Sequence, residues 1–185
     1  MKSLKESLLN RNKVTGNTLD NMYKDELKQE IEEFIDKYYI VFLPSIDIVY
    51  DDILELFVVN TEQIENKFNK CKGLKSLTGG LPFTFGDIKL FEIGEMTNLE
   101  SLEGAPMTCD IMNITRCGMK DLKGIGDVEI KLSIIGCANL ESLEGCPKNL
   151  KYIELSTLSK LKSLKGISPK THRSYYKIPD GLDDK

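Results

Sequence analysis

The hydrophobic positions of this chain follow one short pattern that recurs five times. In each copy a leucine or methionine is followed by two polar residues, a leucine, one further residue and a glycine, at residues 74–79, 99–104, 119–124, 140–145 and 161–166. The copies start 25, 20, 21 and 21 residues apart. A run rich in isoleucine and leucine precedes each later copy, at 88–93, 111–114, 130–135 and 150–155. A unit of about 20 residues cannot bury its apolar face alone, so the pattern predicts stacked coils.

The chain before the repeats has two other patterns. Apolar residues recur at helical spacing from Leu19 to Tyr38, which predicts an amphipathic helix that ends before Pro44. Two apolar runs, 46–50 and 53–59, flank a pair of aspartates and predict a β-hairpin. The helix and the hairpin are expected to cover the first coil, whose apolar side would otherwise be exposed.

A second, short helix is expected after the hairpin. Thr61 would cap it, with Ile64 and Phe68 on one face. The predicted organisation has four parts, which are a flexible N-terminal segment (1–18), an N-terminal helix and hairpin cap (19–73), a solenoid (74–169) and a C-terminal cap and tail (170–185). In the last part, Tyr175, Tyr176 and Ile178 are expected to lie over the final coil.

The fullest copy reads L-x-I-x-x-C-x-x-L-x-S-L-x-G-x-P from Leu132 to Pro147. This resembles leucine-rich repeats, whose core is L-x-L-x-x-N/C-x-L. The N-L-x-S-L-x-G-x-P form is similar to that of short leucine-rich-repeat-like proteins of tailed phages and bacteria, over residues 74–169, and residues 3–9 are similar to the start of such phage proteins. The resemblance implies an interaction surface and no shared chemistry. We therefore expect an α/β repeat fold: a small leucine-rich-repeat-like solenoid of parallel strands.

Charges alternate in sign between equivalent positions of the copies. The residue after the first leucine or methionine is Lys75, Glu100, Lys120, Glu141 and Lys162 in turn, and a second series runs Glu103, Lys123, Glu144 and Lys165. Equivalent positions in a parallel stack lie roughly 5 Å apart, so opposite charges would be neighbours. Exposed pairs contribute little stability, about 0.2–1 kcal/mol each, so we expect the two ladders to penalise wrong registers rather than to form a ligand site.

Composition narrows the class of protein. The 185 residues are 41% hydrophobic and 29% charged, which is typical of a globular domain, and the net charge of -4 argues against whole-chain attraction to nucleic acid. The longest apolar run, 40–43, is far short of the about 20 residues that span a bilayer, and residues 1–10 have no secretory pattern. We expect a cytoplasmic protein with no membrane partner, in the host cytoplasm if the gene is carried by a phage.

Residues that could carry chemistry are few. The five cysteines contain no C-x-x-C pair and are expected to be reduced, with Cys117 and Cys137 as small buried hydrophobes. Equivalents of Cys146 in other copies are alanine and isoleucine, which again indicates an apolar interior site. His172 is the only histidine and lies in a terminal segment. We therefore predict a protein that is not an enzyme, with no catalytic residue, cofactor or metal.

The solvent-facing positions of the strands form the best candidate site. With Leu132 and Ile134 inward, alternate residues point outward from one continuous sheet. The register of the 111–114 strand leaves open whether Met112 or Asn113 faces out. The candidate partner-binding residues are Leu90, Glu92, Met112, Lys131, Ser133, Ile135, Tyr152 and Glu154. Mixed apolar and polar groups of this kind are typical of protein interfaces.

Three functions are compatible with these patterns. The first is a non-enzymatic module that binds a host or phage protein, with inhibition of host defence as one use. The second is a structural or cargo protein of the virion, with residues 3–9 as an address peptide. The third is nucleic-acid binding through the basic C-terminal end.

Charge is divided unevenly along the chain. Residues 25–65 contain twelve acidic and two basic residues, whereas residues 148–177 contain eight basic residues and one acidic residue. A solenoid keeps sequence order in space, so the two segments should lie at opposite ends. This polarity predicts a weak, salt-sensitive self-association or the steering of an acidic partner, the alternative being that both ends are simply solvated.

Overall fold

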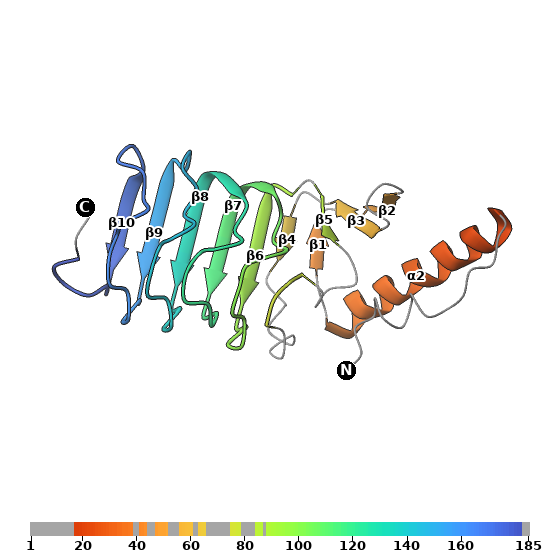
Figure 1. Cartoon of the computed structure of the whole chain (residues 1–185), viewed down its shortest axis with the longest axis horizontal. Coiled ribbons are helices and arrows are strands. Elements are labelled where there is room, and N and C mark those ends of the chain that lie inside the picture. Colours follow the sequence, from red (N-terminus) through yellow and green to blue (C-terminus); the bar gives the residue numbers. More distant parts are fainter. Residues whose placement is uncertain are drawn as a thin grey trace.

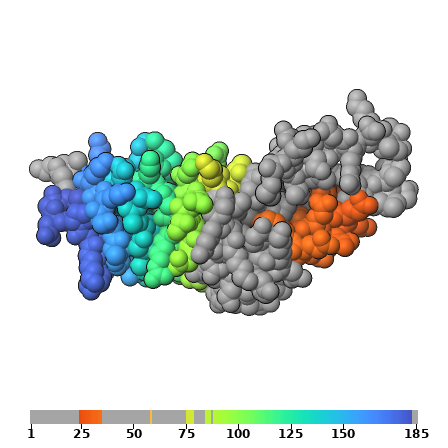
Figure 2. Space-filling model, turned by 90° about the horizontal axis from the view of Figure 1, so that it is seen from below, coloured from red at the N-terminus to blue at the C-terminus, as the bar shows by residue number. Residues whose placement is uncertain are grey.

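Parallel strands stack into a solenoid in the computed structural model of the chain (Figure 1). The structure describes residues 17–38, 41–43, 47–51, 56–60, 63–65, 75–78, 84–86 and 88–182. The repeats contribute β6 (Leu90–Gly94), β7 (Thr108–Thr115), β8 (Asp127–Ile135), β9 (Tyr152–Ser156) and β10 (His172–Tyr176), each parallel to the next. The predicted solenoid is confirmed, and Figure 2 shows its coils as successive colour bands from green to blue.

One apolar core runs through the stack. Alternate residues of each strand point inward, and eight of them are at most 1% exposed: Phe91, Ile93, Met112, Ile114, Leu132, Ile134, Ile153 and Leu155. The leucines and methionine of the repeat pattern complete each layer, with Leu99, Leu102, Met119, Leu122, Leu140 and Leu143 all at 0% exposure. Each coil therefore buries its apolar side chains against its neighbours.

The S-L-x-G part of each repeat forms a tight turn. In one coil the Ser101 hydroxyl accepts a hydrogen bond from Glu103 N at 3.0 Å, and Ala105 N donates to Leu102 O at 2.9 Å. Gly104, between them, has φ +91°, a conformation that glycine adopts without strain. A Cβ there would lie 2.4 Å from the main-chain nitrogen of Thr78 in the preceding coil. The repeat glycine thus permits both the turn and the close stacking.

A left-handed corner follows every strand of the stack. The corner residues are Glu95, Arg116, Gly136, Thr157 and Lys177, with φ between 49° and 67°. The main-chain N–H of each of the first four donates to a carbonyl of the next strand at 2.8–2.9 Å. The corners therefore repeat with the coils, although only one of them is a glycine.

The charge ladders are present in the structure. Lys75 and Glu100 form an ion pair of 3.0 Å, Lys123 and Glu144 one of 3.2 Å, and Lys162 pairs with Glu141. A hydrogen bond from the Lys162 ammonium lowers the pKa of Glu141 below its usual range. Opposite charges on successive coils are therefore neighbours, as the alternation predicts.

The helix and hairpin before the repeats are confirmed. Helix α2 spans Asn17–Tyr38, and β2 (Asp47–Asp51) pairs antiparallel with β3 (Leu56–Asn60). Strand β5 (Thr84–Phe85) joins β3 to complete a separate three-stranded sheet. On α2, the stripe Leu27, Ile31 and Phe34 packs against the core. Helix α2 is not long and apolar enough to cross a membrane, and no other described segment is a helix.

The short helix predicted around Ile64 is wrong. Residues Gln63–Glu65 form strand β4, which lies between β1 (Val41–Leu43) and β6 in the main sheet. Two ladders of main-chain hydrogen bonds, antiparallel to β1 and parallel to β6, favour the strand over an isolated turn of helix. The N-terminal part therefore extends the solenoid sheet. Thr61, Phe68 and residues 1–16, including the proposed address peptide, lie outside the described residues.

The C-terminal segment also differs from its prediction. His172–Tyr176 form a further parallel strand, β10, with His172 opposite Tyr152 and Tyr176 opposite Ser156. The chain after it returns to the core, against which Ile178 and Leu182 pack. The segment predicted as a cap thus begins with another coil.

Candidate protein-binding surface

The outward residues of β6 to β10 form three parallel rows, which we call the outer face. Strand register aligns the first row as Leu90, Ile111, Lys131, Tyr152 and His172, and the middle row as Glu92, Asn113, Ser133, Glu154 and Ser174. The third row is Gly94, Thr115, Ile135, Ser156 and Tyr176. Seven of the eight predicted partner-binding residues lie in these rows.

Met112 is the exception, because its side chain points into the core and is 0% exposed. Asn113 takes the outward position instead. The cause is a β-bulge at the start of β7, where the N–H groups of Asp110 and Ile111 both donate to Lys89 O, at 3.0 and 2.9 Å. The bulge shifts the inward–outward alternation by one residue, so Met112 is removed from the candidate surface.

The middle row is a ladder of paired polar side chains. The Asn113 amide donates to Glu92 at 2.5 Å, and the Ser133 hydroxyl donates to Glu154 at 3.3 Å. Lys131 forms an ion pair of 2.7 Å with Glu154 and, through its hydrogen bond, lowers the pKa of that carboxyl. Ser133 is only 5% exposed. These polar groups bind one another across neighbouring strands. They therefore hold the outer face rigid and leave few hydrogen-bonding groups free to bind a partner.

Exposed apolar and aromatic side chains flank that ladder toward the C-terminal end. Ile135 is 38% exposed, Tyr152 50% and Tyr176 62%. The ring of His172 stacks on that of Tyr152, with centroids 5.3 Å apart and an interplanar angle of 21°. The Lys177 ammonium lies 5.1 Å from the centroid of the Tyr176 ring. Rigid, partly exposed aromatic rings beside cations are the side chains that protein interfaces favour.

Sequence reasoning missed three members of this surface, which are His172, Tyr176 and Lys177. The available signal was the spacing, since Tyr152 and His172 are 20 residues apart, close to the repeat length. This signal was obscured, because β10 has Arg173 and Tyr175 at the inward positions where the strand before it has Ile153 and Leu155.

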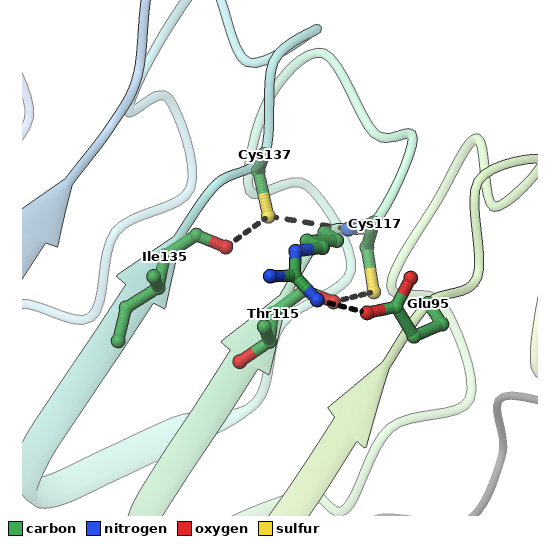
Figure 3. Close-up of polar contacts among 6 residues, drawn as sticks. Glu95, Thr115, Cys117, Ile135 and Cys137 are labelled. Atoms are coloured by element: carbon green, nitrogen blue, oxygen red, sulfur yellow. Dashed lines mark hydrogen bonds and ion pairs between the residues drawn. The ribbon is translucent and has the colours of Figure 1, made fainter.

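The four cysteines that the structure describes are buried in the core. Figure 3 shows the sulfurs of Cys117 and Cys137 beside main-chain carbonyls of Thr115 and Ile135. Cys117 N donates to the Cys137 sulfur at 3.4 Å, and both residues are at most 3% exposed. Desolvation by burial raises the pKa of Cys117 to about 12 and that of Cys137 to about 11. Burial likewise raises the pKa of Cys109 to about 12 and of Cys146 to about 11. Such thiols are poor nucleophiles. Cys71 lies outside the described residues.

In the described part of the chain, no three His, Cys, Asp or Glu side chains lie together as a metal ion would require. The His172 ring contacts Tyr152 on the outer face.

No protein-family model, curated protein or solved structure matches the chain.

Proposed function

We propose that this protein is a non-enzymatic module that binds a protein partner through its outer face. The observation that carries the proposal is the group of exposed Ile135, Tyr152 and Tyr176 side chains on a sheet whose core is fully packed. Tyrosine contributes a large, amphipathic contact area with few torsions to restrict, which suits it to the centre of an interface. The sheet holds these rings in fixed register, so little order has to be gained on binding.

The form of the repeat suggests where the gene comes from and which kind of protein its product binds. We infer a phage-encoded protein that acts on a host or phage protein in the cytoplasm, with inhibition of host defence as one use. Its support is the L-x-S-L-x-G-x-P repeat form and its resemblance to short phage proteins.

The test is affinity capture from a lysate of the cells in which the gene is found, with three forms of the protein. The outer-face variant combines Ile135→Glu with Tyr152→Glu, both at exposed positions. The control is Met107→Glu, at a side chain that is 83% exposed and lies before β7, away from the three rows. We expect the native protein and the control to retain partners that the outer-face variant loses. Equal recovery by all three forms would reject the outer face as the interface.

A second candidate is single-stranded nucleic acid, because exposed rings beside basic side chains also stack bases. Tyr152, His172 and Tyr176 with Lys177 form such a group. Anisotropy of a labelled oligonucleotide, measured with the native protein and with Tyr152→Ala, tests it. Tight binding that the substitution weakens would favour this function, and no binding at low salt would reject it.

A further inference from the structure

The two ends of the molecule carry opposite charge. Helix α2 and strand β10 lie at opposite ends (Figure 1). Around β9 and β10, the side chains of Lys148, Lys151, Lys170 and Lys177 are exposed, as are the rings of Tyr152 and Tyr176. The Lys177 ammonium lies 5.1 Å from the centroid of the Tyr176 ring. We call these four lysines and the two tyrosines the basic end. A surface with this combination attracts acidic partners and offers them apolar contact at the same time.

The described part of α2 presents an acidic face to solvent. Its inner stripe, Leu27, Ile31 and Phe34, packs on the core. The acidic side chains that are exposed there are Asp25, Glu26, Glu30, Glu32 and Glu33. This helix face and the basic end are complementary in charge, but the length of the solenoid separates them within one molecule.

We propose that the basic end binds the acidic face of α2 in a second copy of this chain. Contact between two basic ends or two acidic faces brings like charges together, so only the head-to-tail arrangement is favoured. The tyrosine rings can pack on the aliphatic stems of the helix's long polar side chains. Because two different surfaces meet, the contact leaves one of each free and can propagate along a chain of molecules. The basic end shares Tyr152 and Tyr176 with the outer face. The association does not rest on the proposed function, because it is tested by the mass of the protein alone and by charge changes at lysines and at α2.

Salt dependence is the first measurable consequence. All the charged groups involved are exposed, so their attraction extends over a Debye length of about 30 Å at 0.01 M salt but only about 8 Å at 0.15 M. We expect the weight-average mass in sedimentation equilibrium to rise with protein concentration at the lower salt. It should fall toward the monomer mass at the higher salt. A native protein that is monomeric at every concentration in low salt would overturn the proposal.

A charge-swap experiment on the full chain identifies the surfaces. Lys170→Glu with Lys177→Glu takes the four lysine positions of the basic end from a net charge of +4 to zero. Glu30→Lys with Glu33→Lys takes the five acidic positions of α2 from -5 to -1. Each variant alone should remain monomeric at low salt, and an equimolar mixture of the two should associate again. The control is Lys120→Glu with Lys123→Glu, in the middle of the solenoid. It makes the same change in net charge as the variant of Lys170 and Lys177 and should associate like the native protein. Thermal unfolding of each variant verifies that it is folded.

Two results would contradict the assignment. If the control loses association as fully as the end variants do, net charge and not these surfaces governs it. If the mixture stays monomeric, the basic end and α2 are not partners.

Discussion

At the scale of single residues, the left-handed corners after each strand are the clearest departure from ordinary backbone conformation. Thr157 has φ +56°, and a β-branched residue pays about 1–2 kcal/mol in this region. Gly136 fills the equivalent corner of the preceding coil without that cost. The corner at Thr157 is therefore held by the stack and not by its own residue.

Replacing Thr157 with asparagine, which tolerates left-handed backbone, should stabilise the protein. We expect Thr157→Asn to raise the free energy of unfolding in urea by about 0.5–1 kcal/mol. Ser159→Asn, at a nearby exposed position with ordinary backbone, is the control and should change it little. A loss of stability in Thr157→Asn alone would contradict strain at this corner.

The buried thiols give the protein a pH dependence at alkaline pH. Because burial raises the pKa of Cys117 and Cys137 from 9.0 to about 12 and 11, the folded state keeps both protonated while the unfolded chain ionises. Their contribution is full below pH 9 and is lost as the pH rises toward 11. The free energy of unfolding should therefore fall between pH 9 and 11, and Cys117→Ala with Cys137→Ala should make that fall shallower. Parallel curves for the two proteins would disprove the assignment.

At the scale of elements, the repeat turn depends on its glycine for two separate reasons. Gly145 has φ +96°, and a Cβ there would lie 2.5 Å from Leu122 O of the preceding coil. Gly181 also has a positive φ, +71°, but nothing lies within 4 Å of its Cβ position. A side chain at Gly145 would therefore meet both backbone strain and crowding from the preceding coil, whereas one at Gly181 would meet backbone strain alone.

Alanine at these two glycines should therefore have unequal effects. We expect Gly145→Ala to lower the free energy of unfolding by about 2–4 kcal/mol, because strain and overpacking add. Gly181→Ala should cost about 1 kcal/mol, from strain alone. Urea titrations of both variants measure the difference, and equal losses would show that the close approach between coils relaxes freely.

The sequence predicts an element well where the local pattern of apolar residues determines it, and poorly where contacts with neighbouring strands determine it. The alternation around Leu132 and the helical spacing around Ile31 are local, and both predictions hold. The position of Met112 depends on a bulge set by the neighbouring Lys89 carbonyl, which no local pattern encodes. Ile64 is a strand residue because β1 and β6 flank it. The outward placement of Tyr152 follows from strand alternation alone, but that of its neighbour His172 depends on β10, whose inward residues are not aliphatic.

At the scale of the whole molecule, one continuous core joins the coils, and each coil is stabilised by packing on its neighbours. Leu143 lies in the middle of the described stack and is 0% exposed. Each coil contacts only its neighbours, so a fault in a central layer separates the two halves of the solenoid.

A charge at that layer should therefore disrupt the fold. We expect Leu143→Asp to cost more than about 4 kcal/mol, because it combines a lost leucine with a buried carboxyl group. Leu143→Met keeps the volume and should cost less than about 1.5 kcal/mol. Cooperative thermal unfolding followed by circular dichroism compares them, and an unchanged melt in Leu143→Asp would refute the continuous core.

The alternating charge ladder sets a parity rule for how this solenoid can change length during evolution. Loss of the coil that carries Lys120 would bring Glu100 beside Glu141, so that like charges would face each other where the signs now alternate. Loss of two adjacent coils, those with Lys120 and Glu141, would instead place Glu100 beside Lys162 and preserve the alternation. Duplications follow the same rule. Descendants of this chain should therefore gain or lose coils in pairs, and those that differ by a single coil should carry a compensating change of charge at the junction.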